Sequence, residues 1–210
     1  MTQGPLFKPD SPRRVEIVVF ENVQLLDAAG PLQVFATAND LAHQRGEPTP
    51  YALSTIARET PIITSSAGLA LVVAPLPSHE EFADTMLVAG GYGVNAAAAD
   101  EALLAWLKAR APNVRRLASV CSGALLLASA GLLGGRRATT HWTRCDELAR
   151  RFPDVKVERD PIFIRDGDIW TSAGITAGID LALALVEDDL GRNAALAVAR
   201  QLVEIGRAHV

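Results

Sequence analysis

Cys121 is the side chain of this sequence whose surroundings most clearly suggest chemistry. It lies in the stretch LASVCSGALLLASAGLL (residues 117–133), where an apolar run ends at the cysteine and a segment of small residues begins. The run is typical of a buried strand, and the segment after it is typical of a helix. The pentapeptide SVCSG (119–123) therefore resembles a strand–nucleophile–helix elbow.

A cysteine at such a junction is a candidate nucleophile. The free N–H groups and the dipole at the start of a helix stabilise a thiolate and lower the pKa of the thiol. The small residues Ser122 and Gly123 would permit a sharp turn and keep the sulfur accessible. The alternative is a buried structural cysteine, which is a common state of a free cysteine. The position at the junction favours the functional interpretation.

Other strand ends are expected to converge on Cys121, because ligands of open α/β sheets bind beyond the carboxyl ends of the strands. Asp27 follows the first expected strand and could act as a general acid or base. Gly90 and Gly91 end another strand within LVAGGYGV, which also contains Tyr92. Backbone N–H groups of the glycine pair could hold an oxyanion or a carboxylate. Two alternatives stay open: Asp27 as a helix N-cap, and the glycine pair as a plain tight turn.

The elements that must position these residues alternate between strand and helix. Strands are expected at residues 14–20, 51–57, 69–75, 85–91, 115–120 and 137–142, with two more around a turn at 165–167. The stretch 61–65 is expected to form a hairpin with 69–75. Helices are expected at 30–44, 100–112, 122–133, 143–152, 176–191 and 192–203, with Pro31 in the first turn of the first helix. This alternation predicts an α/β three-layer sandwich with a mostly parallel sheet.

Composition narrows the class of protein. The 210 residues are 49% hydrophobic and 21% charged, which is typical of a soluble globular protein. The net charge of −4 gives the chain itself no strong electrostatic attraction to nucleic acid. Two cysteines make no disulfide framework, and with neither a signal core nor a membrane span we expect a cytoplasmic location. His141 and Cys145 stand four residues apart without a second pair, so no metal and no cofactor is predicted.

The sequence divides into three segments. Residues 1–13 are expected to form a flexible polar arm, and residues 14–203 one domain. Residues 204–210 break the pattern of the helix before them. Residues 205–210 also match the translation of a common sequencing adapter. We therefore expect this tail to be an artefact that replaced natural sequence.

Four segments of the chain resemble a known family. They are VFENVQLLDAAGPLQVF, LVAGGYGV, SVCSGALLLASAGLLGGRRATTHW and IWTSAGITAGIDLALALVE. They look like the ThiJ/PfpI group of class I glutamine amidotransferase-like proteins, over about residues 14–203. The resemblance implies a flavodoxin-like fold and a homodimer.

The resemblance also implies roles for individual residues. Cys121 matches the family nucleophile, and Asp27 matches an acidic residue after the first strand. Gly91 and the backbone of Ser122 match an oxyanion cradle, and His141 matches a histidine near the cysteine.

Departures from the family pattern exclude some activities. The peptidases of this group carry a histidine directly after the cysteine, where this chain has Ser122. Glutamine amidotransferases carry a late His-x-Glu pair, and this chain has none. Glyoxalase-type relatives use a glutamate at the position of Asp27. These differences argue against peptidase, glutaminase and glyoxalase activity.

Three interpretations remain, and the first is preferred. It is a domain that senses a small metabolite near Cys121, at the amino-terminal end of a GlxA-like AraC/XylS transcription regulator. DNA would then be bound only by a carboxyl-terminal domain absent from this chain. The alternative is an enzyme of the isonitrile hydratase type, with Cys121 as nucleophile and Asp27 as acid/base. A family member whose Cys121 is simply oxidised is the third interpretation.

Overall fold

A computed structural model describes residues 11–58 and 61–203. The expected arm over residues 1–13 falls mostly outside this range, and the suspected artefact over 204–210 falls wholly outside it. The first strand begins at Arg13, so the last residue of the expected arm belongs to the sheet.

Strands from distant parts of the chain form a seven-stranded central sheet in the order β10-β11-β7-β6-β1-β2-β5. Neighbouring strands are parallel except for the antiparallel pair β10–β11 at one edge. The strands are β1 (Arg13–Val18), β2 (Tyr51–Ala57), β5 (Ala74–Pro75), β6 (Ala83–Val88), β7 (Val114–Val120), β10 (Phe163–Asp166) and β11 (Ile169–Ser172). All of β6 and nearly all of β7 are buried, as strands covered on both faces must be.

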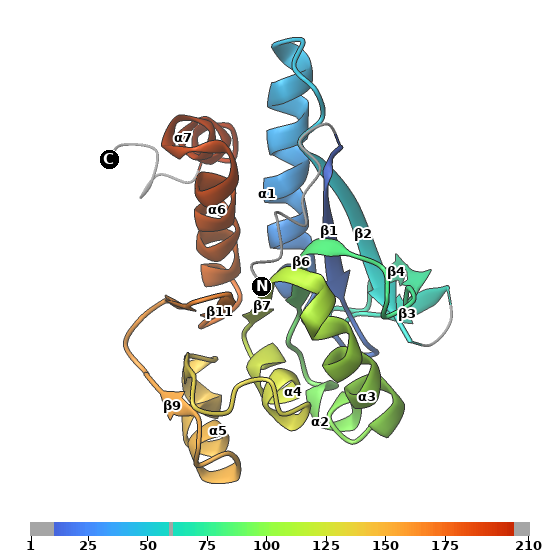
Figure 1. Cartoon of the computed structure of the whole chain (residues 1–210), viewed down its shortest axis with the longest axis vertical. Coiled ribbons are helices and arrows are strands. Elements are labelled where there is room, and N and C mark those ends of the chain that lie inside the picture. Colours follow the sequence, from blue (N-terminus) through green and yellow to red (C-terminus); the bar gives the residue numbers. More distant parts are fainter. Residues whose placement is uncertain (1–10, 59–60, 204–210) are drawn as a thin grey trace, which may run out of the picture.

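Helices cover both faces of the sheet (Figure 1). One face carries α1 (Leu25–Gln44), α6 (Ala177–Leu190) and α7 (Arg192–Gln201), which contact one another. The other carries α2 (Val94–Ala97), α3 (Glu101–Arg110), α4 (Gly123–Ser129) and α5 (Cys145–Arg151). Short elements join these layers: β3 (Ile62–Thr64), β4 (Ala70–Val72), β8 (Arg137–Ala138), β9 (Lys156–Val157) and 3-10 turns at Ala111–Asn113 and Trp142–Arg144. The predicted three-layer α/β architecture with a mostly parallel sheet is confirmed.

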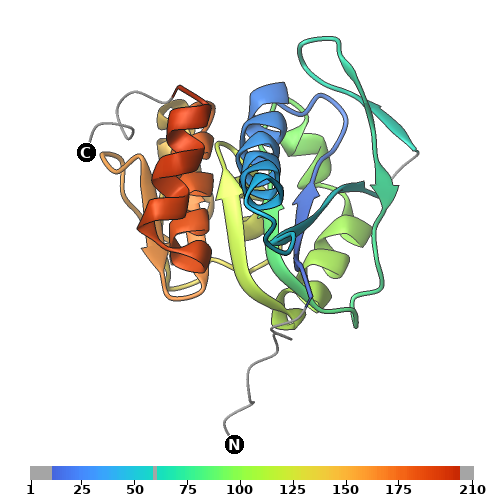
Figure 2. The same ribbon diagram turned by 90° about the horizontal axis from the view of Figure 1, so that it is seen from above.

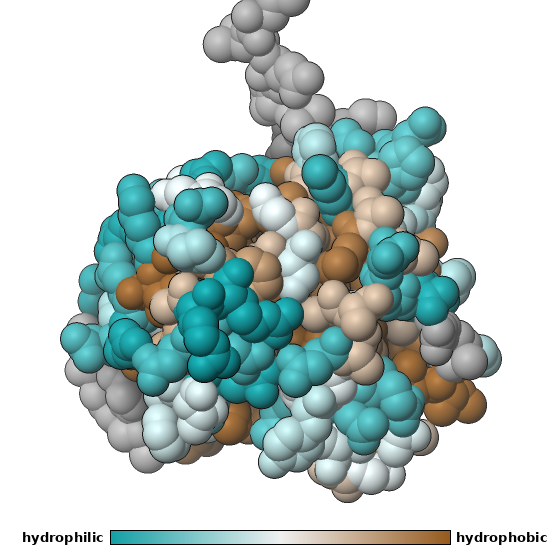
Figure 3. Space-filling view, turned by 90° about the horizontal axis from the view of Figure 1, so that it is seen from below, coloured by the Kyte–Doolittle hydropathy of each residue, from teal (hydrophilic) through white to brown (hydrophobic). Residues whose placement is uncertain are grey.

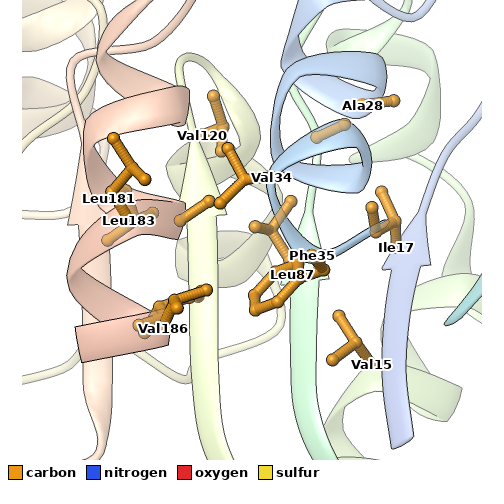
Figure 4. Close-up of a cluster of buried hydrophobic side chains, with 14 of the residues drawn as sticks. Val15, Ile17, Ala28, Val34, Phe35, Leu87, Val120, Leu181, Leu183 and Val186 are labelled. Carbon is orange, nitrogen blue, oxygen red and sulfur yellow. The ribbon is translucent and has the colours of Figure 1, made fainter. Parts of the chain in front are cut away.

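Each helical layer has its own hydrophobic core. Beneath α1 and α6, side chains such as Phe35 and Leu181 meet Leu87 and Val120 of the sheet (Figure 4). On the opposite face, the leucines of α4 pack on Met86 and on α3. Burying one such side chain stabilises the fold by about 1.5–3 kcal/mol. The outer surface of this second layer is mostly hydrophilic (Figure 3).

Helix α1 begins five residues earlier than expected, at Leu25 instead of Gly30. Asp27 consequently lies in the first turn, and the N-cap position belongs to Gln24, so the N-cap interpretation of Asp27 is wrong. Pro31 is inside the helix and not in its first turn. A proline there lacks the N–H that would bond to the carbonyl of Asp27. Tertiary packing overrides this local cost, because Pro31 is buried and α1 contacts both α6 and α7.

Smaller differences concern the edges of the expected elements. The expected strand 69–75 is broken at Val73, whose N–H donates to the carbonyl of Pro61 at 2.8 Å. Its first part, β4, forms the expected hairpin with β3, whereas β5 joins the central sheet beside β2. The helix after Cys121 is shorter than expected and ends at Ser129, and α2 was not anticipated.

An ion cluster fixes the carboxyl-terminal end of α6 to the sheet. The Asp189 carboxylate is 1% exposed and pairs with Arg116, which is itself 2% exposed, and with Arg115. Asp189 also accepts a hydrogen bond of 3.1 Å from the Tyr51 hydroxyl. Arg116 in turn donates to the Thr85 hydroxyl at 2.7 Å. The cluster therefore joins α6 to β2, β6 and β7.

Candidate functional site

Cys121 occupies a tight turn between β7 and α4. Its φ of +54° lies in the left-handed region, which is uncommon for a residue with a Cβ. The Cys121 N–H donates to the carbonyl of Ser172 at 3.1 Å, and its carbonyl accepts from the Thr140 hydroxyl at 2.7 Å. The end of β11 and the segment after β8 therefore hold the turn in place. Strands β1 and β7 point in the same direction, so their carboxyl ends lie at the same edge of the sheet (Figure 2).

The pKa of the Cys121 thiol is higher than its position at a helix start suggested. Only 9% of the residue is exposed, and this burial raises the pKa of the thiol to about 12, with a further contribution from the negative charge of Asp27. The backbone N–H of Ser122 lowers the pKa, as expected of a helix start, but by less. The expectation of a lowered pKa is wrong, because the cost of desolvation exceeds the effect of the turn.

Asp27 lies beside the thiol and is fully buried. Its Oδ1 accepts a hydrogen bond of 2.9 Å from the N–H of Ile175. Within the described part of the chain, Oδ2 has no hydrogen-bond partner of usual geometry. Burial raises the pKa of the carboxyl to about 6, against the opposing effects of Ile175, Cys121 and Gly90. Near neutral pH this group can therefore both give and accept a proton.

Gly90 and Gly91 pass directly behind the Cys121 turn. A Cβ on Gly90 would lie 2.6 Å from the nitrogen of Ser122 and 2.9 Å from Oδ2 of Asp27, so only glycine can occupy this position. The N–H of Gly91 donates to the Ser122 hydroxyl at 2.9 Å. The Gly91 half of the expected oxyanion cradle is thus already engaged by Ser122.

Gly174 and Ile175 complete the surroundings of the thiol, and neither was singled out from the sequence. A Cβ on Gly174, whose φ is +93°, would lie 2.2 Å from the Cβ of Cys121. Ile175 has a φ of +53°, which is strained for a β-branched residue. The glycine in TSAGITAG was the available signal, because glycine permits close backbone approach. The loop between β11 and α6 thereby contacts both Asp27 and Cys121.

A pocket of about 360 Å³ opens above the thiol. Of the residues named from the sequence, it is lined by Gly91, Tyr92, Cys121, Ser122 and His141. The sequence did not indicate the other lining residues, which are Gln24, Ser66, Thr143, Arg144 and Ile175.

The named residues differ in their relation to this pocket. Asp27 and Gly90 lie behind its wall, against Ser122 and the thiol. Tyr92 is 88% exposed, so the phenol stands at the edge of the pocket. Nδ1 of His141 lies 2.8 Å from the Thr143 hydroxyl. The imidazole is thereby held on the pocket wall.

Cys145 is turned away from this pocket. The residue is 1% exposed, and its Sγ lies 3.7 Å from the carbonyl oxygens of Thr140 and His141. Across residues 11–58 and 61–203, no group of three or more His, Cys, Asp or Glu side chains is arranged to hold a metal ion. The chemistry available at the site is therefore that of the thiol, the carboxyl and the polar pocket wall.

The fold and this site define a family. The DJ-1/PfpI family model matches residues 13–188, and the chain belongs to that family. Isonitrile hydratase from Pseudomonas putida is 36% identical over 191 residues, which cover 90% of this chain and 77% of the hydratase.

Transcription regulators are also among the similar proteins. The regulator GlxA from Rhizobium meliloti is 30% identical, with 86% of this chain and 54% of the regulator covered. The regulator GbdR from Pseudomonas aeruginosa is 27% identical, with 96% of this chain and 54% of the regulator covered. The chain thus spans about half the length of these two regulators.

Solved structures agree with the fold. A ThiJ/PfpI family protein from Pseudomonas syringae superposes with a TM-score of 0.80 at 28% identity, covering 98% of this chain and 81% of that one. An AraC family transcriptional regulator from Pseudomonas putida superposes with a TM-score of 0.76 at 23% identity, covering 91% of this chain and all of that one. No helix among the residues described here is long and apolar enough to cross a membrane.

Proposed function

We propose that this chain is the small-molecule sensing domain of an AraC/XylS-type transcription regulator, with its ligand in the pocket above Cys121. The similarity to GlxA and GbdR supports this function. DNA binding would belong to a further domain of the regulator, in keeping with the net charge of −4 on this chain. We also propose a homodimer, following the family resemblance, which gel filtration of the purified chain would test.

The state of the Cys121 thiol carries this proposal. A thiol whose pKa is about 12 is almost entirely protonated at pH 7, and the nucleophile of cysteine chemistry is the thiolate. The sulfur nevertheless lines a pocket with polar walls. A protonated thiol on a pocket wall supports binding of a molecule more than attack on it, which favours the sensor over the catalyst.

Reading the source gene beyond codon 203 tests the regulator directly. We expect an open reading frame that continues into a basic helix-turn-helix domain. A natural stop codon at or near codon 203 would overturn the proposal that this chain is part of a transcription regulator.

Ligand binding can be tested on the purified chain of 210 residues. A metabolite that occupies the pocket at about 100 times its Kd should raise Tm by about 5–10 °C. Thr143→Trp, which fills part of the pocket, should abolish this shift. Thr64→Trp places the same bulk on exposed β3 and should leave the shift intact.

A second function is favoured by the neighbouring carboxyl. With its pKa near 6, Asp27 suits a general acid or base at neutral pH, and isonitrile hydratase is among the similar proteins. Cys121 would attack the isonitrile carbon while Asp27 supplies the proton. Water would then release an N-substituted formamide and restore the thiol, so that the net change is addition of one water molecule. Only this second function consumes the molecule that occupies the pocket.

A further inference from the structure

We propose that Thr140 is a positioning residue for Cys121, whose hydroxyl fixes the turn between β7 and α4 and so keeps the sulfur buried at the pocket wall. The inference rests on the proposed function only in taking this pocket as the functional site, and it applies to a sensor and to a hydratase alike. Thr140 is not among the described residues that line the pocket, so it acts on the thiol through the backbone.

The Cys121 turn needs support from outside α4. Its φ of +54° is disfavoured for a residue with a Cβ, and such a conformation persists only where the surrounding structure enforces it. In a regular α-helix the N–H of Leu125 would donate to the carbonyl of Cys121, four residues earlier. Here that N–H donates to the carbonyl of Ser122 at 2.9 Å. The first turn of α4 therefore leaves the Cys121 carbonyl to another donor.

Thr140 supplies that donor. Its Oγ1 donates to the Cys121 carbonyl at 2.7 Å, and the residue is only 1% exposed, so solvent does not compete for the bond. The segment around Thr140 is itself anchored. The N–H of Thr139 donates to the Thr171 hydroxyl at 2.8 Å, and the Thr140 carbonyl lies 3.7 Å from Sγ of Cys145. The hydroxyl is thus presented to the turn from a fixed backbone.

Loss of this hydroxyl should change the state of the thiol. The Cys121 carbonyl would be left without a partner in a buried place, and movement of the turn toward solvent relieves that cost. Burial is the main cause that raises the pKa of the Cys121 thiol to about 12. A turn that moves admits water to the sulfur, and the smaller cost of desolvation lowers the pKa.

Two adjacent threonines provide matched variants. Thr140→Val keeps the shape of the side chain and removes the bonded hydroxyl, whereas Thr140→Ser keeps the hydroxyl. Thr139 is fully buried, and within the described part of the chain its hydroxyl has no hydrogen-bond partner. Thr139→Val therefore removes the same group one residue away without breaking a bond. Asp100→Ala controls for lower stability, because it removes the N-cap of α3.

Alkylation by iodoacetamide measures the thiolate of Cys121 without a known ligand. The sulfur attacks the CH₂ carbon, iodide leaves, and the thiol proton passes to the buffer. Rates are measured between pH 7 and pH 11, and peptide mass spectrometry separates Cys121 from Cys145. We expect Thr140→Val to react about tenfold faster at pH 8, equivalent to a decrease of about one pKa unit. Its rate should begin to level off near pH 11, where that of the unaltered protein still rises about tenfold per pH unit.

Thr140→Ser, Thr139→Val and Asp100→Ala should keep the rate and the pH profile of the unaltered protein. An unchanged or slower rate in Thr140→Val would overturn the proposal, as would an equal acceleration in Thr139→Val or in Thr140→Ser. The same acceleration in Asp100→Ala would assign the effect to general instability and also count against it.

Thr140→Ala, which likewise lacks the hydroxyl, takes the place of Thr140→Val if the valine variant does not fold. Failure of both to fold, while Thr140→Ser folds, would mean that the hydroxyl serves the whole fold and would refute a role specific to Cys121. A stop codon near position 203 would remove the regulator and leave the result of this experiment standing.

Discussion

The backbone N–H of Ile175 donates a hydrogen bond to Oδ1 of Asp27 and so joins two residues that are 148 positions apart in the sequence. The preceding residue, Gly174, lies directly against Cys121. The loop between β11 and α6 therefore sets both the position of the carboxyl and the space available to the thiol.

Replacing Asp27 should make Cys121 more reactive. The pKa of the thiol is raised first by burial and then by the negative charge of Asp27, so Asp27→Asn removes only the second cause. We expect iodoacetamide to alkylate Cys121 about tenfold faster at pH 8, equivalent to a decrease of about one pKa unit. Asp40→Asn removes the same charge from the exposed side of α1 and should leave the rate unchanged. An unchanged or slower rate of alkylation in Asp27→Asn would contradict the effect of the Asp27 charge on the Cys121 thiol.

The same substitution should stabilise the protein above pH 6. Burial raises the pKa of Asp27 from 3.8 to about 6 in the folded state, so the unfolded chain loses this proton at lower pH. The contribution of Asp27 to stability is therefore full below pH 3.8 and lost as the pH rises through 6. Asparagine has no such proton to lose. The free energy of unfolding of Asp27→Asn should exceed that of the unaltered protein by up to about 3 kcal/mol at pH 8.

Urea denaturation at several pH values measures this difference. The excess stability of Asp27→Asn should shrink as the pH falls and be absent at pH 3.5, provided that both proteins still fold there. An excess that stays constant with pH would mean that the carboxyl is not the titrating group.

A methyl group at Gly174 should be strongly destabilising. Its Cβ would lie 2.2 Å from that of Cys121, and its φ of +93° disfavours any side chain. We expect Gly174→Ala to lose more than about 2 kcal/mol of unfolding free energy, or to fail to fold. Gly134→Ala is the matched control, because a Cβ there meets nothing within 4 Å. Equal stabilities of the two variants, measured by thermal denaturation, would show that the loop does not press on the thiol.

The ion cluster at the end of α6 should contribute to stability through Asp189. This carboxylate is 1% exposed and faces the buried guanidinium of Arg116. Asp189→Asn leaves that charge without its main partner, which costs about 3–5 kcal/mol for a buried pair. The side chain of its neighbour Asp188 is 24% exposed, and Asp188→Asn should cost less than about 1 kcal/mol. Chemical denaturation of both variants measures these losses of unfolding free energy. Similar losses would show that burial of Asp189 does not strengthen its contribution to stability.

The fold could be predicted from the sequence because its signals are local. Runs such as TMLVAGG and LASV are typical of buried strands, and Asp100, the first residue of the helix expected over 100–112, is the N-cap of α3. The start of α1 could not be predicted, because a proline in this stretch indicates the first turn of a helix. The position of Pro31 inside the helix depends on packing against α6 and α7, which no local pattern records.

The candidate site was partly predictable for the same reason. Cys121, Asp27 and the glycine pair follow strands, so their convergence follows from a parallel sheet. The raised pKa of the thiol could not be predicted from the sequence, because the burial that causes it depends on tertiary packing around the turn. Arg144 was missed because its own segment carries no motif. Ile175 was missed although it lies in a segment that resembles the family, because only the folded loop brings it to the pocket.

Turnover of an isonitrile tests the sensing function most directly, because a sensor leaves its ligand unchanged. The chain is incubated with tert-butyl isonitrile at pH 7, and N-tert-butylformamide is quantified by mass spectrometry beside a Cys121→Ala control. We predict the same background of formamide in both samples. Formamide that accumulates over many turnovers in the unaltered protein and falls to background in Cys121→Ala would contradict the sensor and establish the hydratase.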